Sequence, residues 1–488
     1  MGDITTARNL TMMTDLYQLT MMYGYYRFNM TKNEAVFDLF FRYRENSAYA
    51  IMAGTESVID YINNLRFDEG DIDYLRSLGL FDEGFLEELR RLRFTGEIYA
   101  MPEGSVVFPY EPLIRVRAPI MQAQLVETAL LNLVNHQTLI ATKAARVVYA
   151  AAGDGVMEFG LRRAQGPDAG IYGARAAMIG GCTGTSNVLT GQMFDVGVAG
   201  THAHSWVMSF PSELEAFRAY AEIFPTSCML LVDTYDTLRM GVPNAITVFR
   251  ELEAKGYKPV GIRLDSGDLA YLSKRARTML DEAGFPEAKI FASGDLDETV
   301  IRDLKAQGAR IDVWGVGTKL ITSLDCPALG GVYKLSAEVV NGEIVPKIKL
   351  SENVIKMTNP GYKKVLRLYN KNNGMALADL IALDDEVIDE TKPLKIFHPQ
   401  QTYKTKTLRD FRVREMLVPI FIDGKQVYDP PTVAEIQAYS KKELATFWEE
   451  SKRLLNPHEY KVDLSDRLYE LKQKLIRELR TSNENQES

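Results

Sequence analysis

The residues best suited to chemistry lie in the stretch GTHAHSWVMSF, from Gly200 to Phe210. The chain has five histidines, and His202 and His204 stand here one residue apart. Three interpretations are open: two metal ligands on one face of a strand, one imidazole acting as a nucleophile or general base, or two histidines that only pack. No further His or Cys lies nearby in the sequence, so a metal site here would need carboxylates to complete it.

Charged residues follow two of the apolar runs in the middle of the chain. In GIRLDSGDL, Arg263 and Asp265 stand two residues apart, so the end of a strand carries both on one side. A cation and an anion there suit a ligand that is both phosphorylated and polyhydroxylated, whereas a local salt bridge is the simpler alternative. The run CMLLV is likewise followed by Asp233 and Asp236.

Short glycine turns follow the next two apolar runs. ASGDLDE contains Gly294 and Asp295, and WGVGTKL contains Gly315, Gly317 and Thr318. Glycine allows the backbone to approach a ligand closely and exposes N–H groups to a phosphate. Any tight turn uses glycine, however, so each turn alone is weak evidence for a phosphate site.

The segment EFGLRRAQG, residues 158–166, combines Phe159 with Arg162 and Arg163. An aromatic face and two guanidinium groups can hold a flat anionic ring through stacking and carboxylate pairing. A buried phenylalanine beside two solvated arginines is the alternative. The loop GGCTGTSNV, which contains Ser186, is by itself generic for a turn.

Alternating strands and helices must position these residues. The pattern predicts helices over 243–256, 269–284 and 298–308, each ending in glycine, between strand-and-turn segments 227–237, 259–268, 288–298 and 310–318. Such alternation predicts parallel strands whose carboxyl ends form the functional edge of an α/β fold. We expect a TIM-like α/β barrel, because no GxGxxG motif marks a dinucleotide crevice; an open doubly wound sheet is the alternative.

Three domains are predicted along the chain. Residues 1–140 form an N-terminal α+β domain, residues 141–345 the barrel-like core, and residues 346–488 a C-terminal domain with a helical tail. Alternating apolar residues around Asn341-Gly342 predict a hairpin. The polar last stretch, residues 481–488, is expected to be disordered.

Composition limits the class of protein. The net charge of −8 argues against a nucleic-acid partner, and no apolar run is long enough to predict a membrane span. The N-terminus lacks the pattern of a secretory signal. The three cysteines are widely spaced, which argues against disulfides or a thiolate zinc site and for the cytoplasm.

The motifs in their order resemble the nicotinate phosphoribosyltransferase family. They are TDLYQLTM, FGLRRAQGP, GTSNV, GTHAHSWVMSF, VDTYDT, IRLDSGDL and WGVGT, and the resemblance extends over nearly the full chain. It implies transfer of the phosphoribosyl group of phosphoribosyl pyrophosphate (PRPP) to nicotinate, with Mg²⁺ as a partner of the diphosphate. The products are nicotinate mononucleotide and pyrophosphate, in the salvage of NAD. It also implies coupled ATP hydrolysis through a phosphorylated histidine.

The resemblance assigns roles residue by residue. His204, before Ser in AHS, is the implied phosphoacceptor, and no role carries over to His202. Phe159 would stack on one face of nicotinate and Tyr17 of a second subunit on the other, which implies a homodimer with shared active sites. Arg162 would lie near the ring and phosphate. The remaining implied contacts are with the ribose, the diphosphate or the 5′-phosphate, and come from Arg263, Asp265, Asp233, Gly294, Asp295, Gly317 and Thr318.

Ser186 separates the alternatives within the family. Nicotinamide-specific relatives place an aspartate there, which would accept from an amide and repel a carboxylate, so Ser186 favours nicotinate. A quinolinate-using relative would need no phosphohistidine. An inactive scaffold on the same fold would be expected to lose His204, Arg263 or Asp265, and all three are present.

Overall fold

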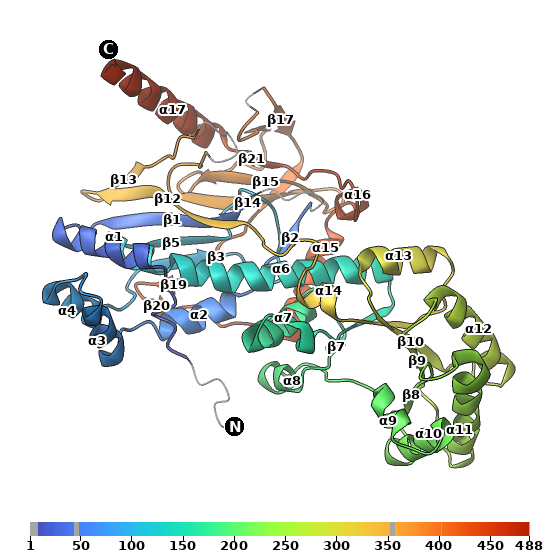
Figure 1. Cartoon of the computed structure of the whole chain (residues 1–488). Coiled ribbons are helices and arrows are strands. Elements are labelled where there is room, and N and C mark those ends of the chain that lie inside the picture. Colours follow the sequence, from blue (N-terminus) through green and yellow to red (C-terminus); the bar gives the residue numbers. More distant parts are fainter. Residues whose placement is uncertain (1–7, 43–47, 352–356, 402, 488) are drawn as a thin grey trace. The chain divides into compact units, whose positions relative to one another are not determined.

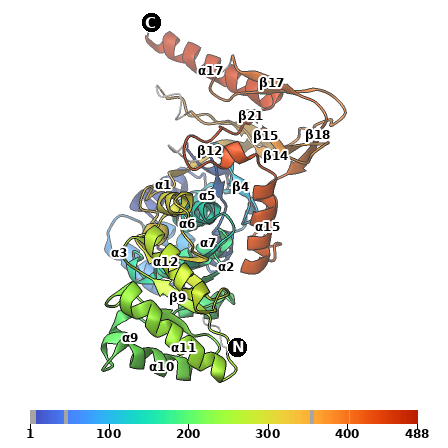
Figure 2. The ribbon, with the colours of Figure 1, turned by 90° about the vertical axis from the view of Figure 1, so that its right-hand side faces the viewer.

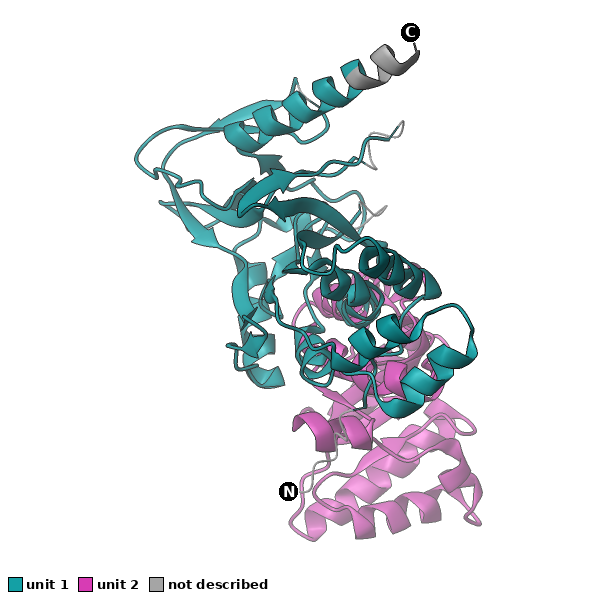
Figure 3. Cartoon of the chain, turned by 90° about the vertical axis from the view of Figure 1, so that its left-hand side faces the viewer, with its two compact units in different colours: residues 1–139, 328–488 teal, residues 140–327 magenta. Residues whose placement is uncertain are grey.

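The computed structural model describes residues 8–42, 48–351, 357–401 and 403–487. The chain forms two compact units (Figure 3): unit 1 combines residues 1–139 with residues 328–488, and unit 2 is the continuous segment 140–327. Unit 1 therefore contains both ends of the chain. The division into three domains, with boundaries at residues 140 and 345, stays a prediction.

Unit 1 is built on antiparallel sheets (Figure 1). A seven-stranded sheet has the order β13 (Glu343–Pro346), β12 (Gly331–Val340), β1 (Glu34–Phe41), β5 (Ile114–Pro119), β3 (Glu97–Ala100), β19 (Val418–Ile422), β20 (Lys425–Gln426). A six-stranded sheet, antiparallel except for the pair β15 and β21, has the order β17 (Thr405–Leu408), β16 (Leu394–Phe397), β21 (Val462–Leu464), β15 (Ala376–Leu383), β14 (Lys363–Asn370), β18 (Phe411–Glu415). A short ladder pairs β2 (Ala50–Ile51) with β4 (Val106–Val107).

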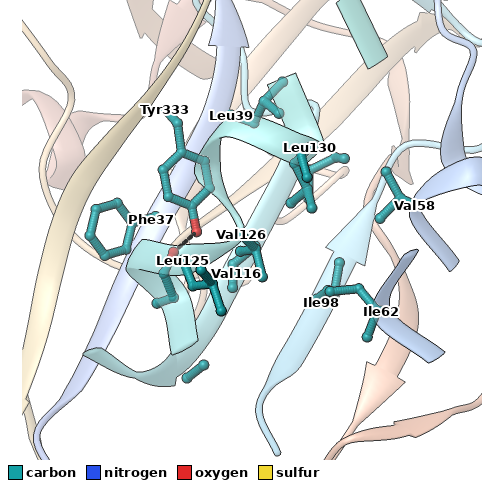
Figure 4. Close-up of a cluster of buried hydrophobic side chains, with 14 of the residues drawn as sticks. Phe37, Leu39, Val58, Ile62, Ile98, Val116, Leu125, Val126, Leu130 and Tyr333 are labelled. Atoms are coloured by element: carbon teal, nitrogen blue, oxygen red, sulfur yellow. Dashed lines mark hydrogen bonds between the residues drawn. The ribbon is translucent and has the colours of Figure 1, made fainter. Parts of the chain in front are cut away.

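An extensive hydrophobic core of unit 1 packs helices against the seven-stranded sheet (Figure 4). The rings of Phe37 and Tyr333 stack with centroids 4.7 Å apart, and the Tyr333 hydroxyl donates to the Ala123 carbonyl at 2.7 Å. The helices that begin in this unit are α1 (Leu16–Arg27), α2 (Thr55–Asn63), α3 (Glu69–Ser77), α4 (Glu83–Arg91), α5 (Ile120–Leu125), α6 (Glu127–Ala151), α15 (Val433–Ala445), α16 (Glu449–Lys452) and α17 (Asp466–Glu487). None of the described helices is long and apolar enough to cross a membrane.

Two predictions about the C-terminal part have opposite outcomes. The hairpin is confirmed, since β12 and β13 pair across Asn341 and Gly342, whose φ angles of 53° and 82° suit a tight hairpin turn. The expected disorder from residue 481 is wrong, because α17 continues to Glu487. Nothing in TSNENQE breaks a helix, since it contains neither Gly nor Pro. Ser488 lies outside the described residues.

Unit 2 contains the predicted parallel sheet. Its order is β7 (Gly184–Thr185), β6 (Gly155–Glu158), β11 (Val313–Val316), β10 (Lys289–Gly294), β9 (Gly261–Leu264), β8 (Met229–Leu231), and every pair is parallel. The α/β class is confirmed. Within residues 140–327 the ladder ends at β7 and β8, so closure into a barrel stays a prediction.

The predicted helices between these strands are also present. Gly256, Gly284 and Gly308 follow them with φ of 83°, 92° and 76°, the left-handed conformation that ends helices. In Figures 1 and 2, α9 to α11 lie together, and Figure 1 shows them next to β8. The helices of unit 2 are the 3₁₀ turn η1 (Leu161–Arg163), α7 (Pro167–Ile179), α8 (Val188–Phe194), α9 (His204–Met208), α10 (Glu213–Ile223), the π turn η2 (Thr237–Gly241), α11 (Val242–Ala254), α12 (Leu269–Glu282), α13 (Glu298–Ala306) and α14 (Thr318–Ile321).

The close approach of Gly241 to the end of β8 predicts that Gly241→Ala destabilises unit 2. A Cβ at Gly241 would lie 1.8 Å from the carbonyl oxygen of Val232, so the π turn must move away. We expect a loss of about 1–3 kcal/mol in the free energy of unfolding, measured by chemical denaturation. Gly197→Ala is the control, because its nearest atom would be Thr183 O at 3.7 Å, and its cost should be within about 0.5 kcal/mol. Equal stabilities of the two variants would contradict the packing argument.

Candidate functional site

Arg263, at the end of β9, is the centre of a hydrogen-bonded cluster. Its Nη2 lies 2.7 Å from Asp265 Oδ1, its Nε donates to Ser293 Oγ at 2.8 Å, and its Nη1 donates to Thr201 Oγ1 at 2.8 Å. Ser293 also donates to Asp265 Oδ1. Arg263 and Asp265 therefore form the local salt bridge that is the simpler interpretation of this motif. The hydroxyl groups of Ser293 and Thr201 hold the pair in one geometry. Its part in ligand binding stays a prediction.

The cluster keeps Asp265 ionised. Burial opposes ionisation of this carboxyl, but the hydrogen bonds from Ser293 and Arg263, together with the charge of Arg263, outweigh burial and hold its pKa below the ordinary value. The site therefore contains a fixed anion beside a fixed cation at neutral pH.

Asp233, just after β8, fixes the backbone of the neighbouring strand end. Its Oδ2 accepts from the Asp265 N–H at 2.9 Å and from Ser266 Oγ at 2.6 Å. Its Oδ1 is buried and has no hydrogen-bond partner among the described residues. The Asp233 carboxylate thus positions Asp265, and one of its own oxygens is buried without a hydrogen-bond partner among the described residues.

His204 faces this cluster from the first turn of α9. Its Nδ1 lies 3.2 Å from Thr234 Oγ1, and its Nε2 lies 4.0 Å from Asp265 Oδ2. The side chain is 40% exposed, so a reactant can reach it. The prediction that His204 shares an edge with the aspartates is confirmed.

His202 has a different environment. It is 7% exposed, its Nε2 accepts from the Leu231 N–H at 3.2 Å, and its ring contacts Tyr220 edge-on with centroids 4.7 Å apart. The interpretation of the two histidines as metal ligands on one face of a strand is therefore wrong. His204 begins a helix, and the two rings lie in separate surroundings. The described residues include no group of three or more His, Cys, Asp or Glu side chains able to hold a metal.

Phe159, directly after β6, lies beside the cluster. Its ring packs on β11 where Gly315 leaves room, since a Cβ there would come within 2.7 Å of the ring. The Arg263 guanidinium carbon is 6.0 Å from the ring centroid. The half-buried ring thus lies close enough to the ion pair for one ligand to contact both.

The other predicted binding residues surround Phe159 or follow the strand ends. Ser186 N–H donates to the Glu158 carbonyl at 3.0 Å, and Arg162 is exposed on η1. Gly294 and Asp295 are exposed at the end of β10, and Gly317, after β11, and Thr318, the first residue of α14, are half-buried. Tyr17 is 49% exposed on α1, in unit 1, and its approach to this site stays a prediction.

Sequence reasoning missed the hydroxyl groups that hold the cluster together. The position of Ser293 could have been predicted from strand geometry. Arg263 of β9 pairs with Phe291 of β10, and the two-residue period of a strand puts Ser293 on the same side of the sheet as these two residues. Thr201 and Thr234 carried no such signal. They come from loops, where spacing does not determine which way a side chain points.

Sequence models of nicotinate phosphoribosyltransferases match three segments of the chain: the N-terminal domain over residues 12–135, the family over 155–351 and the C-terminal domain over 362–472. The chain is 50% identical to nicotinate phosphoribosyltransferase of Bacillus subtilis, covering 97% of this chain and 96% of that protein. The crystal structure of human nicotinic acid phosphoribosyltransferase matches with a TM-score of 0.82 and 33% identity, covering 95% of this chain and 99% of the other. A nicotinate-nucleotide pyrophosphorylase structure from Pyrococcus furiosus, 23% identical with a TM-score of 0.68, covers 91% of this chain and 99% of that one and shares the fold.

The environment of His202 predicts a loss of stability in acid. Burial lowers its pKa from 6.5 to about 4, so the unfolded chain binds a proton more readily than the folded one. The stabilising effect of the neutral ring is complete above pH 6.5 and is lost as the pH falls toward 4. Between pH 7.5 and 5 this group should account for about 2 kcal/mol of the free energy of unfolding.

His202→Gln tests this, because its amide oxygen can still accept from Leu231 and does not titrate. Urea denaturation over the same pH range should show a shallower decline in the variant than in the natural protein. Identical declines would mean that His202 is not the group responsible.

Proposed function

The chain belongs to the nicotinate phosphoribosyltransferase family, and we propose that it converts nicotinate and PRPP to nicotinate mononucleotide and pyrophosphate, driven by ATP through a phosphohistidine at His204. The observation that carries this proposal is the position of His204. Its Nε2 faces Asp265, while Asp265 is paired with Arg263. A reactive imidazole, a fixed anion and a fixed cation thus meet at one strand edge.

Phosphoribosyl transfer requires little from a general base. The pyridine nitrogen of nicotinate already carries a lone pair, so the bond to ribose C1 forms as the bond from C1 to the diphosphate oxygen breaks. The protein must stabilise positive charge on the ribosyl group and negative charge on the departing diphosphate. The ionised Asp265 suits the first and Arg263 the second.

His204 is held for attack through one nitrogen. Contact with Thr234 occupies Nδ1, whereas Nε2 has no hydrogen-bond partner among the described residues. The lone pair of Nε2 attacks the γ-phosphorus of ATP, the bond from that phosphorus to the bridging oxygen breaks, and ADP leaves with the electron pair. Hydrolysis of the resulting phosphohistidine supplies the free energy that favours product formation.

The nicotinate ring fits against Phe159. Its carboxylate needs cationic or neutral hydrogen-bonding neighbours, and Arg162 and Ser186 are of this kind. A second subunit would supply Tyr17 to the other face of the ring, so we propose a homodimer with shared active sites. The side chain of Tyr17 is 49% exposed, which would allow a second subunit's ligand to contact its ring.

The glycine turns suit the phosphate groups of PRPP. Gly294 and Asp295 would contact the ribose or its 5′-phosphate, and Gly317 and Thr318 would line the 5′-phosphate site through backbone N–H groups.

Mg²⁺ fits the same edge. The partnerless Asp233 Oδ1 and the outer oxygen of Asp265 are hard ligands of the type that Mg²⁺ takes, with the diphosphate supplying the others. When bound, Mg²⁺ neutralises charge on the diphosphate. We also propose a cytoplasmic location, with which three cysteines that form no disulfide in the described part of the chain agree.

The proposal is tested by product formation from PRPP and Mg²⁺ with nicotinate or nicotinamide, each with and without ATP. We expect nicotinate mononucleotide, formed faster or more completely with ATP. His204→Ala should reduce the rate with ATP to the rate without it and abolish labelling of the protein by γ-³²P-ATP. His398 lies in unit 1, so His398→Ala is the control. This variant should keep both the stimulation by ATP and the labelling by γ-³²P-ATP.

Three outcomes would count against the proposal in different ways. Turnover of nicotinamide would show that Ser186 does not select the carboxylate. If ATP still stimulates the His204→Ala variant, the coupling does not pass through a phosphohistidine at His204. No product from either ring would overturn the enzyme activity itself.

A further inference from the structure

Glu158 is a buried carboxylate at the end of β6 that the proposed reaction does not use. It is 0% exposed, although it directly precedes the half-buried Phe159. Burying a carboxylate is costly unless its oxygens accept hydrogen bonds. Both oxygens of Glu158 do so, which explains how the group is tolerated and indicates which parts of the chain it connects.

Each oxygen of Glu158 holds a different loop. Oε1 accepts from the N–H of Gly160, the residue from which η1 begins. Oε2 accepts from the hydroxyl of Thr185 at 2.6 Å, and the Glu158 carbonyl accepts from the N–H of Ser186 at 3.0 Å. One residue therefore binds both the turn that carries Arg162 and the loop that carries Ser186.

The loop that carries Ser186 is held by further hydrogen bonds beyond Thr185. Thr185 Oγ1 accepts from the N–H of Asn187 at 3.0 Å, so its own hydroxyl hydrogen is left for Glu158. The Asn187 side chain donates to the Gly170 carbonyl in α7 at 3.2 Å and caps α8 by accepting from Thr190 N–H. The backbone on both sides of Ser186 is thus fixed by hydrogen bonds that start at Glu158.

The two guanidinium groups on η1 have no comparable anchor. The side chains of Arg162 and Arg163 are exposed, and neither guanidinium group has a hydrogen-bond or ion-pair partner among the described residues, although the Arg163 backbone N–H donates to the Gly160 carbonyl. Their position relative to Ser186 is therefore set by the backbone of η1, which begins at the amide that Glu158 holds. Without that anchor, only backbone pairing, between β6 and β7 and from Ser186 to Glu158, would relate the Ser186 loop to the start of the Arg162 turn.

We infer that Glu158 is a positioning residue for the pyridine carboxylate: through Gly160 and Thr185 it sets the spacing between the Arg162 turn and the Ser186 loop. The inference rests on the proposed function, because it assigns Arg162 and Ser186 to the nicotinate carboxylate. The PRPP residues follow β8 to β11, and no hydrogen bond among the described residues joins them to the Glu158 side chain. Gly317 packs beside Phe159 and Gly160, whereas Thr185 lies on β7, on the opposite side of β6 from β11. Loss of the anchor should weaken nicotinate binding and leave PRPP binding unchanged.

The test is Thr185→Val, which keeps the shape of the side chain and removes the hydroxyl that donates to Glu158. The KM for nicotinate should rise at least about tenfold, while the KM for PRPP changes less than about twofold. A merely structural role would move both constants together or would only lower the melting temperature. Thr185→Ser, which keeps the hydroxyl, should restore a nicotinate KM within about threefold of the natural protein.

Thr183→Val is the matched control. It is the same substitution two residues earlier, where the exposed hydroxyl donates to the Val156 carbonyl and not to Glu158, so both KM values should stay unchanged. If Thr185→Val does not fold, Glu158→Asp takes its place. The shorter carboxylate cannot reach both loops and should show the same split between the two substrates.

The outcomes separate the two claims. A natural protein that makes no nicotinate mononucleotide overturns the proposed function, and this inference with it. An active natural protein whose folded Thr185→Val or Glu158→Asp variant lacks the split, or changes the KM for PRPP equally, overturns the role of Glu158 alone.

Discussion

The ion pair of Arg263 and Asp265 is the interaction on which the rest of the site depends. Both groups are largely withdrawn from water, with 19% and 32% of their side chains exposed, so neither would be stable there alone. Ser293 and Thr201 satisfy further donors of the guanidinium group, and Asp233 holds the backbone N–H of Asp265. Residues from several segments of the chain therefore support one cation and one anion.

This arrangement follows from the parallel sheet. The carboxyl ends of parallel strands meet at one edge, and the loops after them can point short polar side chains at a common centre. In unit 2, β8, β9 and β10 each end in such residues, and β11 ends in glycines that leave room for Phe159. The fold supplies the edge, and the loops supply the chemistry.

The two histidines show how two neighbours in sequence acquire different roles. His202 fills an apolar position and accepts from an edge-strand amide, so it stays neutral and supports β8. His204, two residues later, has entered a helix and faces the carboxylate of Asp265. A His-x-His spacing alone cannot distinguish this from a metal site, because the outcome depends on where a strand-like segment gives way to a helix.

Much of unit 2 was predictable, because its signals are local. Helices ended by glycine and apolar runs ended by aspartate determine the order of elements and the edge on which Arg263 and Asp265 lie. The partners of those residues were not predictable, since Thr201 and Thr234 come from loops whose course depends on tertiary packing. The helical end of the chain differs for another reason: its polar composition predicts disorder, although nothing in it stops α17.

The measurement that tests the account most directly is a double-mutant cycle on Arg263→Met and Asp265→Asn, followed through kcat/KM for PRPP. If the pair acts as one unit, each single variant should lose at least about 100-fold, and the double variant should lose little more than either, far less than the product of the two losses. Denaturation of each variant would show that the fold persists. Losses that multiply, or an Asp265→Asn variant that keeps full activity, would contradict the central place of this ion pair.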